Sequence, residues 1–272
     1  MVCHTGRIHN LENSMTEMQA AGRPVWYELL TTDVKAAEKF YTAVVGWRVT
    51  PFEGSPDPYD LWTRSGGAPI GGVMKIPDGA GFPPHWLMYV GVAKLEDAVA
   101  RVQRLGGSTL SPLITVPTVG RLQVMKDPQG AIFAIHEPAP SSSVAPEAPP
   151  EIGDVSWREL STTDAAAAMK FYADMFGWRE TQAMDMGPMG KYHIFGRAFD
   201  LGGMMNKPPE MAQVPPNWGL YFRVEDVNAG VERVKANGGR VLNGPMEVPG
   251  GDLVVNCMDP QGAAFSLHQR RR

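Results

Sequence analysis

The sequence has little cysteine, no long apolar run and no excess of basic residues, and each absence excludes a class of protein. Two cysteines in 272 residues build no disulfide framework, which favours a reducing, cytoplasmic setting. No apolar stretch approaches the roughly 20 residues that cross a bilayer, and the first twenty residues lack the apolar block of a secretory signal. The net charge of −4 offers no broad basic field. We therefore expect neither a membrane partner nor a nucleic-acid partner.

What is present is an internal repeat. Residues 26–50 and 157–181 are identical at 15 of 25 positions, and the turn sequence Asp-Pro-Gln-Gly recurs at 127–130 and 259–262. The stretch between the copies is rich in Pro, Ser and Ala, a composition typical of an extended spacer. The sequence predicts a flexible N-terminal tail (1–21), a first module (22–138), a linker (139–151) and a second module (152–270).

Each copy shows the pattern of two βαβββ units. In the first copy, a short apolar run is followed by Asp33, which suits a helix N-cap, and then by a stripe of apolar residues at helical spacing. Gly46 and its counterpart Gly177 stand where a helix ends in a left-handed residue. One helix on a short mixed sheet leaves the other sheet face bare, and pairing two units closes the bare faces into a cup. We expect an α+β fold of two tandem modules with mixed, cup-shaped sheets and helices outside.

The paired βαβββ units, the Phe-Tyr and Gly-Trp pairs and the Asp-Pro-Gln-Gly turn resemble the vicinal oxygen chelate superfamily, the group of glyoxalase I, bleomycin-resistance proteins and extradiol dioxygenases. The resemblance covers 24–137 and 155–269 and extends to tandem two-module bacterial proteins of the glyoxalase-like kind. It implies a small-molecule ligand or substrate in a cup. In members with metal chemistry, it implies four His or Glu ligands from the first, fourth, fifth and eighth strands.

Most of those metal-ligand positions carry residues that do not bind metals. The first-strand position falls on Trp26 and Trp157, and the fourth-strand stretches Ile-Gly-Gly-Val-Met and Leu-Gly-Gly-Met-Met offer no carboxylate or imidazole. The fifth- and eighth-strand positions hold Leu87, Gly219, Ala134 and Ser266. We therefore expect no cofactor, with a divalent metal held by other ligands as the alternative.

Side chains two residues apart on a strand share a face. Glu28 and Glu159 stand two residues after Trp26 and Trp157, the first-strand positions, so both glutamates are expected to point into the cups. His136 and His268, two residues past the eighth-strand position, are expected there by the same argument. A Glu and a His within reach of each other, in one module or across both, could act as a catalytic acid/base pair. The structural alternative is that the glutamates pair with backbone and the histidines lie at exposed strand ends.

Aromatic and basic side chains are the candidates for ligand binding. Aromatic walls suit a flat or apolar guest, and core packing is the alternative account of the same residues. Arg223 aligns with Gly91 and would make the two cups differ in charge. The ligand-binding candidates are Trp26, Trp157, Tyr59, Tyr192, Trp86, Trp218 and Arg223.

Three functions remain open. The first is a glyoxalase-like enzyme without the standard metal site, which transforms a small oxygenated molecule with Glu28 or Glu159 as base. The second is a non-catalytic protein that sequesters a drug or metabolite, as bleomycin-resistance proteins do. The third is a metal-dependent lyase or dioxygenase. Because the chain already holds two modules, we expect a monomeric pseudo-dimer, with a homodimer as the alternative.

Overall fold

The computed structural model describes residues 20–54, 58–140, 142 and 147–271. The expected tail lies outside the described residues except for its last two positions, and so do residues 141 and 143–146 of the expected linker. Within the described ranges, no helix has both the length and the apolar character needed to cross a membrane.

The first copy forms one curled sheet with two helices. Its strand order is β2-β3-β4-β1-β5-β9-β8-β6, with β7 paired to β8. The elements are β1 (Pro24–Thr31), α2 (Val34–Val45), β2 (Arg48–Pro51), β3 (Asp60–Thr63), β4 (Pro69–Lys75), β5 (His85–Gly91), α3 (Leu95–Arg104), β6 (Ser108–Thr109), β7 (Ile114–Val116), β8 (Gly120–Lys126) and β9 (Ile132–Pro138).

The second copy repeats this arrangement. Its strand order is β11-β12-β13-β10-β14-β17-β16-β15. The elements are β10 (Val155–Thr162), α4 (Ala165–Phe176), β11 (Arg179–Asp185), a 3₁₀ turn (Gly187–Met189), β12 (Lys191–Gly196), β13 (Asp200–Asn206), a second 3₁₀ turn (Pro209–Met211), β14 (Asn217–Arg223), α5 (Val227–Ala236), β15 (Arg240–Glu247), β16 (Leu253–Met258) and β17 (Ala264–Gln269).

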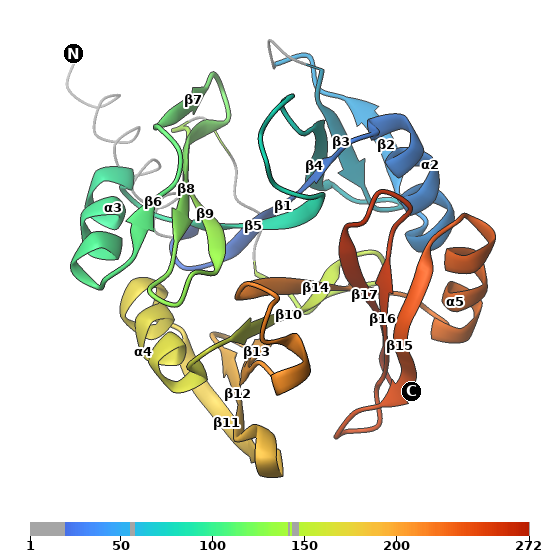
Figure 1. The fold of residues 1–272 in the computed structure, drawn as a ribbon. Helices are drawn as coiled ribbons and strands as arrows, with labels where there is room; N and C mark the ends of the chain where they lie inside the picture. Colours follow the sequence, from blue (N-terminus) through green and yellow to red (C-terminus); the bar gives the residue numbers. More distant parts are fainter. Residues whose placement is uncertain (1–19, 55–57, 141, 143–146, 272) are drawn as a thin grey trace, which may run out of the picture.

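Each sheet contains two βαβββ units joined at its centre. The central strands β1 and β5 are antiparallel, and each has the last strand of its own unit, β4 or β9, as a parallel neighbour on its other side. Figure 1 shows the two sheets curling in opposite directions, with α2 beside α5 and α3 beside α4 at the flanks. This is the α+β architecture of two cup-shaped modules that the repeat predicts.

Local sequence signals set the helix ends. The Asp33 carboxylate accepts a hydrogen bond from the Ala36 backbone N–H at 3.0 Å, and Asp164 does the same at α4. Gly46 ends α2 with φ of 88°, a left-handed conformation that glycine adopts without steric cost. The predicted caps are therefore confirmed.

The hydrophobic core lies between the convex faces of the two sheets and is shared by both modules. Tyr41 of α2, for example, packs against Phe222 and Phe265 of the second module, with ring centroids 6.1 and 5.3 Å apart. Trp86 of β5 meets Phe222 at 5.0 Å. Because the helix-bearing faces are buried against each other, the concave faces point away from the centre of the molecule.

The repeated motifs make reciprocal contacts between the modules. The Tyr41 hydroxyl donates to the Asp259 carboxylate at 3.1 Å, and the Tyr172 hydroxyl donates to the Asp127 carboxylate at 3.0 Å. Each aspartate also accepts three backbone N–H groups of its own turn. The Phe-Tyr pair and the Asp-Pro-Gln-Gly turn thus join the two halves of the chain.

Candidate functional site

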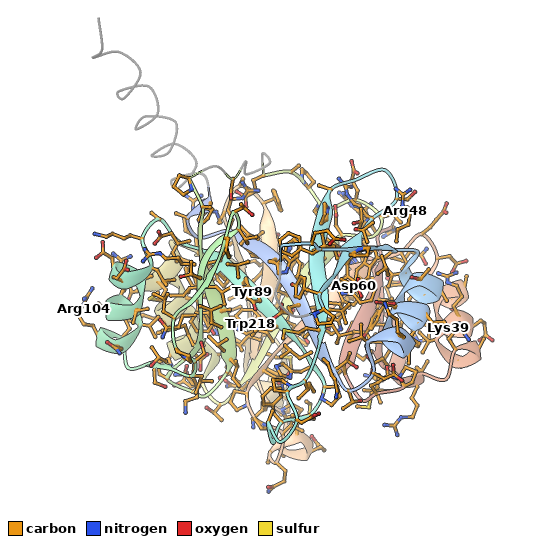
Figure 2. The ribbon with its side chains drawn as sticks, turned by 90° about the horizontal axis from the view of Figure 1, so that it is seen from above. Lys39, Arg48, Asp60, Tyr89, Arg104 and Trp218 are labelled. Carbon is orange, nitrogen blue, oxygen red and sulfur yellow. The ribbon has the colours of Figure 1, made fainter. Side chains whose placement is uncertain are left out.

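The glutamates of the first strands lie on the concave faces. In β1, Tyr27 and Leu29 belong to the shared core, so Trp26 and Glu28 point the other way, into the first cup. Figure 2 shows Tyr89 of β5 near the middle of the molecule, with Lys39 and Arg104 at opposite ends. Tyr89 is one of the residues that contact Glu28 on this face.

In the first cup, Glu28 is held by two tyrosines. One carboxylate oxygen accepts a hydrogen bond from the Tyr59 hydroxyl at 2.8 Å, and the other accepts from the Tyr89 hydroxyl at 2.6 Å. The Trp26 indole N–H donates to the Tyr59 oxygen at 2.9 Å. We call Trp26, Glu28, Tyr59 and Tyr89 the first glutamate cluster.

The second cup repeats the arrangement. The Glu159 carboxylate accepts from the Tyr192 hydroxyl at 2.8 Å and from the Tyr221 hydroxyl at 3.1 Å. The Trp157 indole N–H donates to the Tyr192 oxygen at 2.8 Å. Trp157, Glu159, Tyr192 and Tyr221 form the second glutamate cluster.

A glycine makes room for one tyrosine in each cluster. Gly72 of β4 is the register partner of Glu28, and a Cβ atom there would lie 2.1 Å from the Tyr59 oxygen. Gly203 is the partner of Glu159, and its Cβ would lie 2.2 Å from Tyr192. Both glycines belong to the Gly-Gly pairs of the fourth-strand stretches, which supply no metal ligand. Because they lack a side chain, a tyrosine ring can lie across the strand at this point.

Burial governs the proton affinities in both clusters. It raises the pKa of Glu28 and of Glu159, and the tyrosine hydrogen bonds oppose this by stabilising the charged form. Burial and the neighbouring carboxylates raise the pKa of Tyr89 and Tyr221 well above the usual value. The tyrosines therefore stay protonated donors, while the glutamates bind protons more readily than in water.

The two histidines make other contacts. The His136 Nε2 lies 3.3 Å from the Val119 carbonyl oxygen. The His268 ring contacts the Ser156 hydroxyl at 2.7 Å and the Asp252 carboxylate at 2.9 Å. Among the described side chains, no hydrogen bond joins either imidazole to a cluster glutamate. The acid/base role of His136 and His268 stays a prediction.

The expectation that Trp86 and Trp218 line the cups is corrected by the structure. Both lie in the shared core, where their indole N–H groups donate at 3.0 Å to Tyr41 and Tyr172. They stand one residue before Leu87 and Gly219, and adjacent strand residues face opposite sides. Core packing is therefore the correct account of these two side chains.

Two further outcomes concern the cup lining. The Arg223 guanidinium donates to the Pro150 carbonyl, so it ties β14 to the segment that precedes the second module.

Tyr89 and Tyr221 were not predicted from the sequence. They stand two residues after Leu87 and Gly219, so strand alternation from the fifth-strand position would have found both.

The side chains of the clusters do not fit a divalent metal. Each cluster holds one carboxylate, both of whose oxygens already accept tyrosine hydrogen bonds. No three His, Cys, Asp or Glu side chains come together as a metal-binding group in the part of the chain that the structure describes. Catalytic metal sites use about three such ligands.

Two grooves lie elsewhere, at the junctions between the modules. One of about 690 Å³ is lined by Val45, Val224 and Arg233, among others. Its repeat-related counterpart, of about 550 Å³, is lined by Phe176 and Arg101, among others. Neither groove includes a residue of the glutamate clusters among its lining residues.

Comparison with known proteins agrees with this architecture. Residues 154–267 match the family described as the Glyoxalase/Bleomycin resistance protein/Dioxygenase superfamily, and residues 26–136 match a glyoxalase-like domain. The chain is 32% identical over 252 residues to "Putative glyoxylase CFP32" of Mycobacterium tuberculosis, covering 90% of this chain and 94% of that protein.

Two more distant similarities also cover most of this chain. The anthracycline biosynthesis protein DauV of a Streptomyces species is 29% identical, over 93% of this chain and 94% of that protein. The Mn(II)-bound glyoxalase from Novosphingobium aromaticivorans shares the fold, with a TM-score of 0.64 at 15% identity over 93% of this chain and 83% of that one. The chain therefore belongs to the glyoxalase/bleomycin resistance protein/dioxygenase superfamily.

Proposed function

We propose that this chain binds a small oxygenated organic molecule on a concave face and that a cluster glutamate accepts a proton from it. The observation that carries the proposal is the same four-residue cluster built twice, each with one carboxylate held between two tyrosine hydroxyls. Raised glutamate pKa values bring the base closer to the working pH, which favours general acid/base catalysis.

The cluster geometry suits a positioned base. An ionised carboxylate has about four acceptor sites, and the two tyrosine hydroxyls use about half of them. The remaining lone pairs of Glu159 can accept a proton from a bound C–H or O–H group. The hydroxyls of Tyr192 and Tyr221 fix the carboxylate orientation, and the neutral acid that forms is the state that burial favours.

The names of the relatives support the class of ligand. One relative is named a glyoxylase and another an anthracycline biosynthesis protein, and both names refer to small oxygenated compounds. A planar polyoxygenated aromatic is therefore a suitable first probe. We choose 1,4-dihydroxyanthraquinone, which absorbs visible light and is expected to quench tryptophan fluorescence.

The test combines conversion with binding. Small carbonyl and phenolic compounds, including this probe, are screened by NMR in D₂O for protein-dependent conversion or hydrogen–deuterium exchange. We expect the Glu28→Gln/Glu159→Gln double variant to lose about 100-fold or more in rate. The matched control is Glu232→Gln, whose side chain is 74% exposed on α5. Unchanged turnover in the double variant would refute the proposed base.

Sequestration without catalysis is the second candidate. The observation that favours it is that both glutamate oxygens are already occupied by tyrosine donors, which also suits a passive hydrogen-bond acceptor. Tight binding of a panel compound with no conversion, and loss of that binding in the double variant, would select this function over proton transfer.

A further inference from the structure

The two cups share their glutamate clusters but differ in the residues around them. On the first concave face, Leu87, Tyr89 and Ala134 form a separate buried apolar cluster, with Leu87 only 4% exposed and Ala134 fully buried. The apolar side chains packed against it include Val25, Leu30 and Val124. The first cup is therefore filled by a small hydrophobic core of its own.

The second copy replaces five of these apolar side chains with glycine or polar residues. Repeat spacing and strand register relate the positions, because Leu87 pairs with Glu28 as Gly219 pairs with Glu159. The counterparts of Val25, Leu30, Leu87, Val124 and Ala134 are Ser156, Ser161, Gly219, Asn256 and Ser266. Five apolar positions thus change while the tryptophan, the glutamate and both tyrosines are retained.

Gly219 leaves open space beside the second glutamate. A Cβ atom built there would have one neighbour within 4 Å, the Glu159 carbonyl oxygen at 3.7 Å, which is an ordinary contact. At the same place in the first cup, the Leu87 side chain fills the volume. A ligand can therefore approach Glu159 where it cannot approach Glu28.

A polar pair lies next to this space. The Ser266 hydroxyl donates to the Asn256 side-chain oxygen at 2.9 Å, and Ser266 is the register partner of Tyr221. The amide nitrogen of Asn256 makes no hydrogen bond within the described chain. An amide N–H group suits a carbonyl or hydroxyl oxygen of a ligand whose other end reaches Glu159.

We propose that the ligand site of this protein is the second cup, where Gly219 admits the ligand, the Asn256 amide N–H donates to its oxygen while Ser266 holds the amide in place, and Glu159 accepts a proton from its acidic group. The first cup is packed core and binds nothing. This inference rests on the proposed function for the role of Glu159, but the difference in accessibility between the cups stands on the packing alone.

Cysteine labelling tests the accessibility without a ligand. Gly219→Cys and Leu87→Cys are each made in a Cys3→Ser background. We compare the rates at which the two new thiols react with 2-aminoethyl methanethiosulfonate. Burial raises the pKa of the native Cys257 thiol to about 12, which keeps it unreactive. We expect the cysteine at 219 to react at least about tenfold faster than the one at 87. Equal rates, or faster labelling at 87, would overturn the inference.

Exchanging residues between the cups tests the ligand site itself. Each variant imports the residue that the other cup already accommodates, and binding of 1,4-dihydroxyanthraquinone is followed by tryptophan quenching. We expect Gly219→Leu and Asn256→Val to weaken binding by about tenfold or more, and Leu87→Gly and Val124→Asn to change it less than about twofold. The opposite pattern would overturn the inference.

The two proposals fail in different ways. If the wild-type protein binds no panel compound, the proposed function is refuted for that chemical class, and the labelling rates alone decide between the cups. If the probe binds but only the first-cup variants weaken it, the proposed function survives and the second cup is the wrong site.

Discussion

At the scale of single residues, a buried carboxyl group makes stability depend on pH. Burial raises the pKa of Glu28, so the folded state favours the protonated acid. Its contribution to stability is full below the ordinary value near 4.5 and is lost as the pH rises through the raised pKa. The buried Glu28 carboxyl group thus carries a measurable cost of folding at neutral pH.

We predict that Glu28→Gln removes this pH dependence, because glutamine does not ionise. We measure the free energy of unfolding by urea denaturation between pH 4.5 and pH 8.5. As the pH rises, the wild type should lose stability relative to the variant, so the value for the variant minus that for the wild type should increase. The exposed Glu232→Gln variant should follow the wild type throughout. A difference between Glu28→Gln and wild type that stays constant with pH would contradict the assignment.

The glycine beneath each tyrosine provides a second prediction. In Gly203→Ala, the new methyl group would lie 2.2 Å from Tyr192, so the ring must move away from Glu159. We expect a loss of about 1–3 kcal/mol in unfolding free energy, as for other overpacked sites, and a change in tryptophan fluorescence.

Gly219→Ala is the matched control, because its nearest neighbour would be 3.7 Å from the methyl group. It should change stability by less than about 0.5 kcal/mol. Equal losses for the two alanine variants would show that strand flexibility, and not the tyrosine contact, determines the cost.

At the scale of elements, α4 is tied to the turn between β8 and β9 by one hydroxyl group. The Tyr172 oxygen donates to Asp127 and accepts from the Trp218 indole N–H. We predict that Tyr172→Phe costs about 1–3 kcal/mol, since it leaves two buried polar groups without this partner. Thermal and urea unfolding measure the loss, with Lys170→Ala on the exposed side of α4 as control. An unchanged free energy of unfolding in Tyr172→Phe would contradict a stabilising role of this hydroxyl group.

At the scale of the whole molecule, the modules are halves of one folding unit. Aromatic contacts such as those of Tyr41 with Phe222 and Phe265 cross between them, and so do the tyrosine–aspartate hydrogen bonds. An isolated half would expose this core to water. The expected monomer stays a prediction.

We therefore predict that cutting the chain at a protease site placed within 139–151 leaves the halves bound to each other. Light scattering after size-exclusion chromatography should give a mass near 29.6 kDa before and after cleavage. Two halves that elute separately as folded monomers would contradict a shared core. A mass of twice that value before cleavage would favour the homodimer.

The local sequence by itself determined the repeat, the element order, the caps at Asp33 and Gly46, and the side of β1 on which Glu28 lies. The repeat follows from comparing residues 26–50 with 157–181. The other features follow from patterns along one strand or helix, which depend on near neighbours only. That Trp26 and Trp157 stand at metal-ligand positions is what the resemblance to the superfamily implied, and periodicity alone does not show it.

Only the tertiary structure decided which face of each sheet is buried in the shared core and which face lines a cup. It places Trp86 and Trp218 in a core between the modules, brings Tyr89 and Tyr221 onto the glutamates, and fills one cup while opening the other. Strand alternation separates two faces without saying which one is buried against another sheet. That choice depends on contacts between residues more than a hundred positions apart, such as Tyr41 and Asp259.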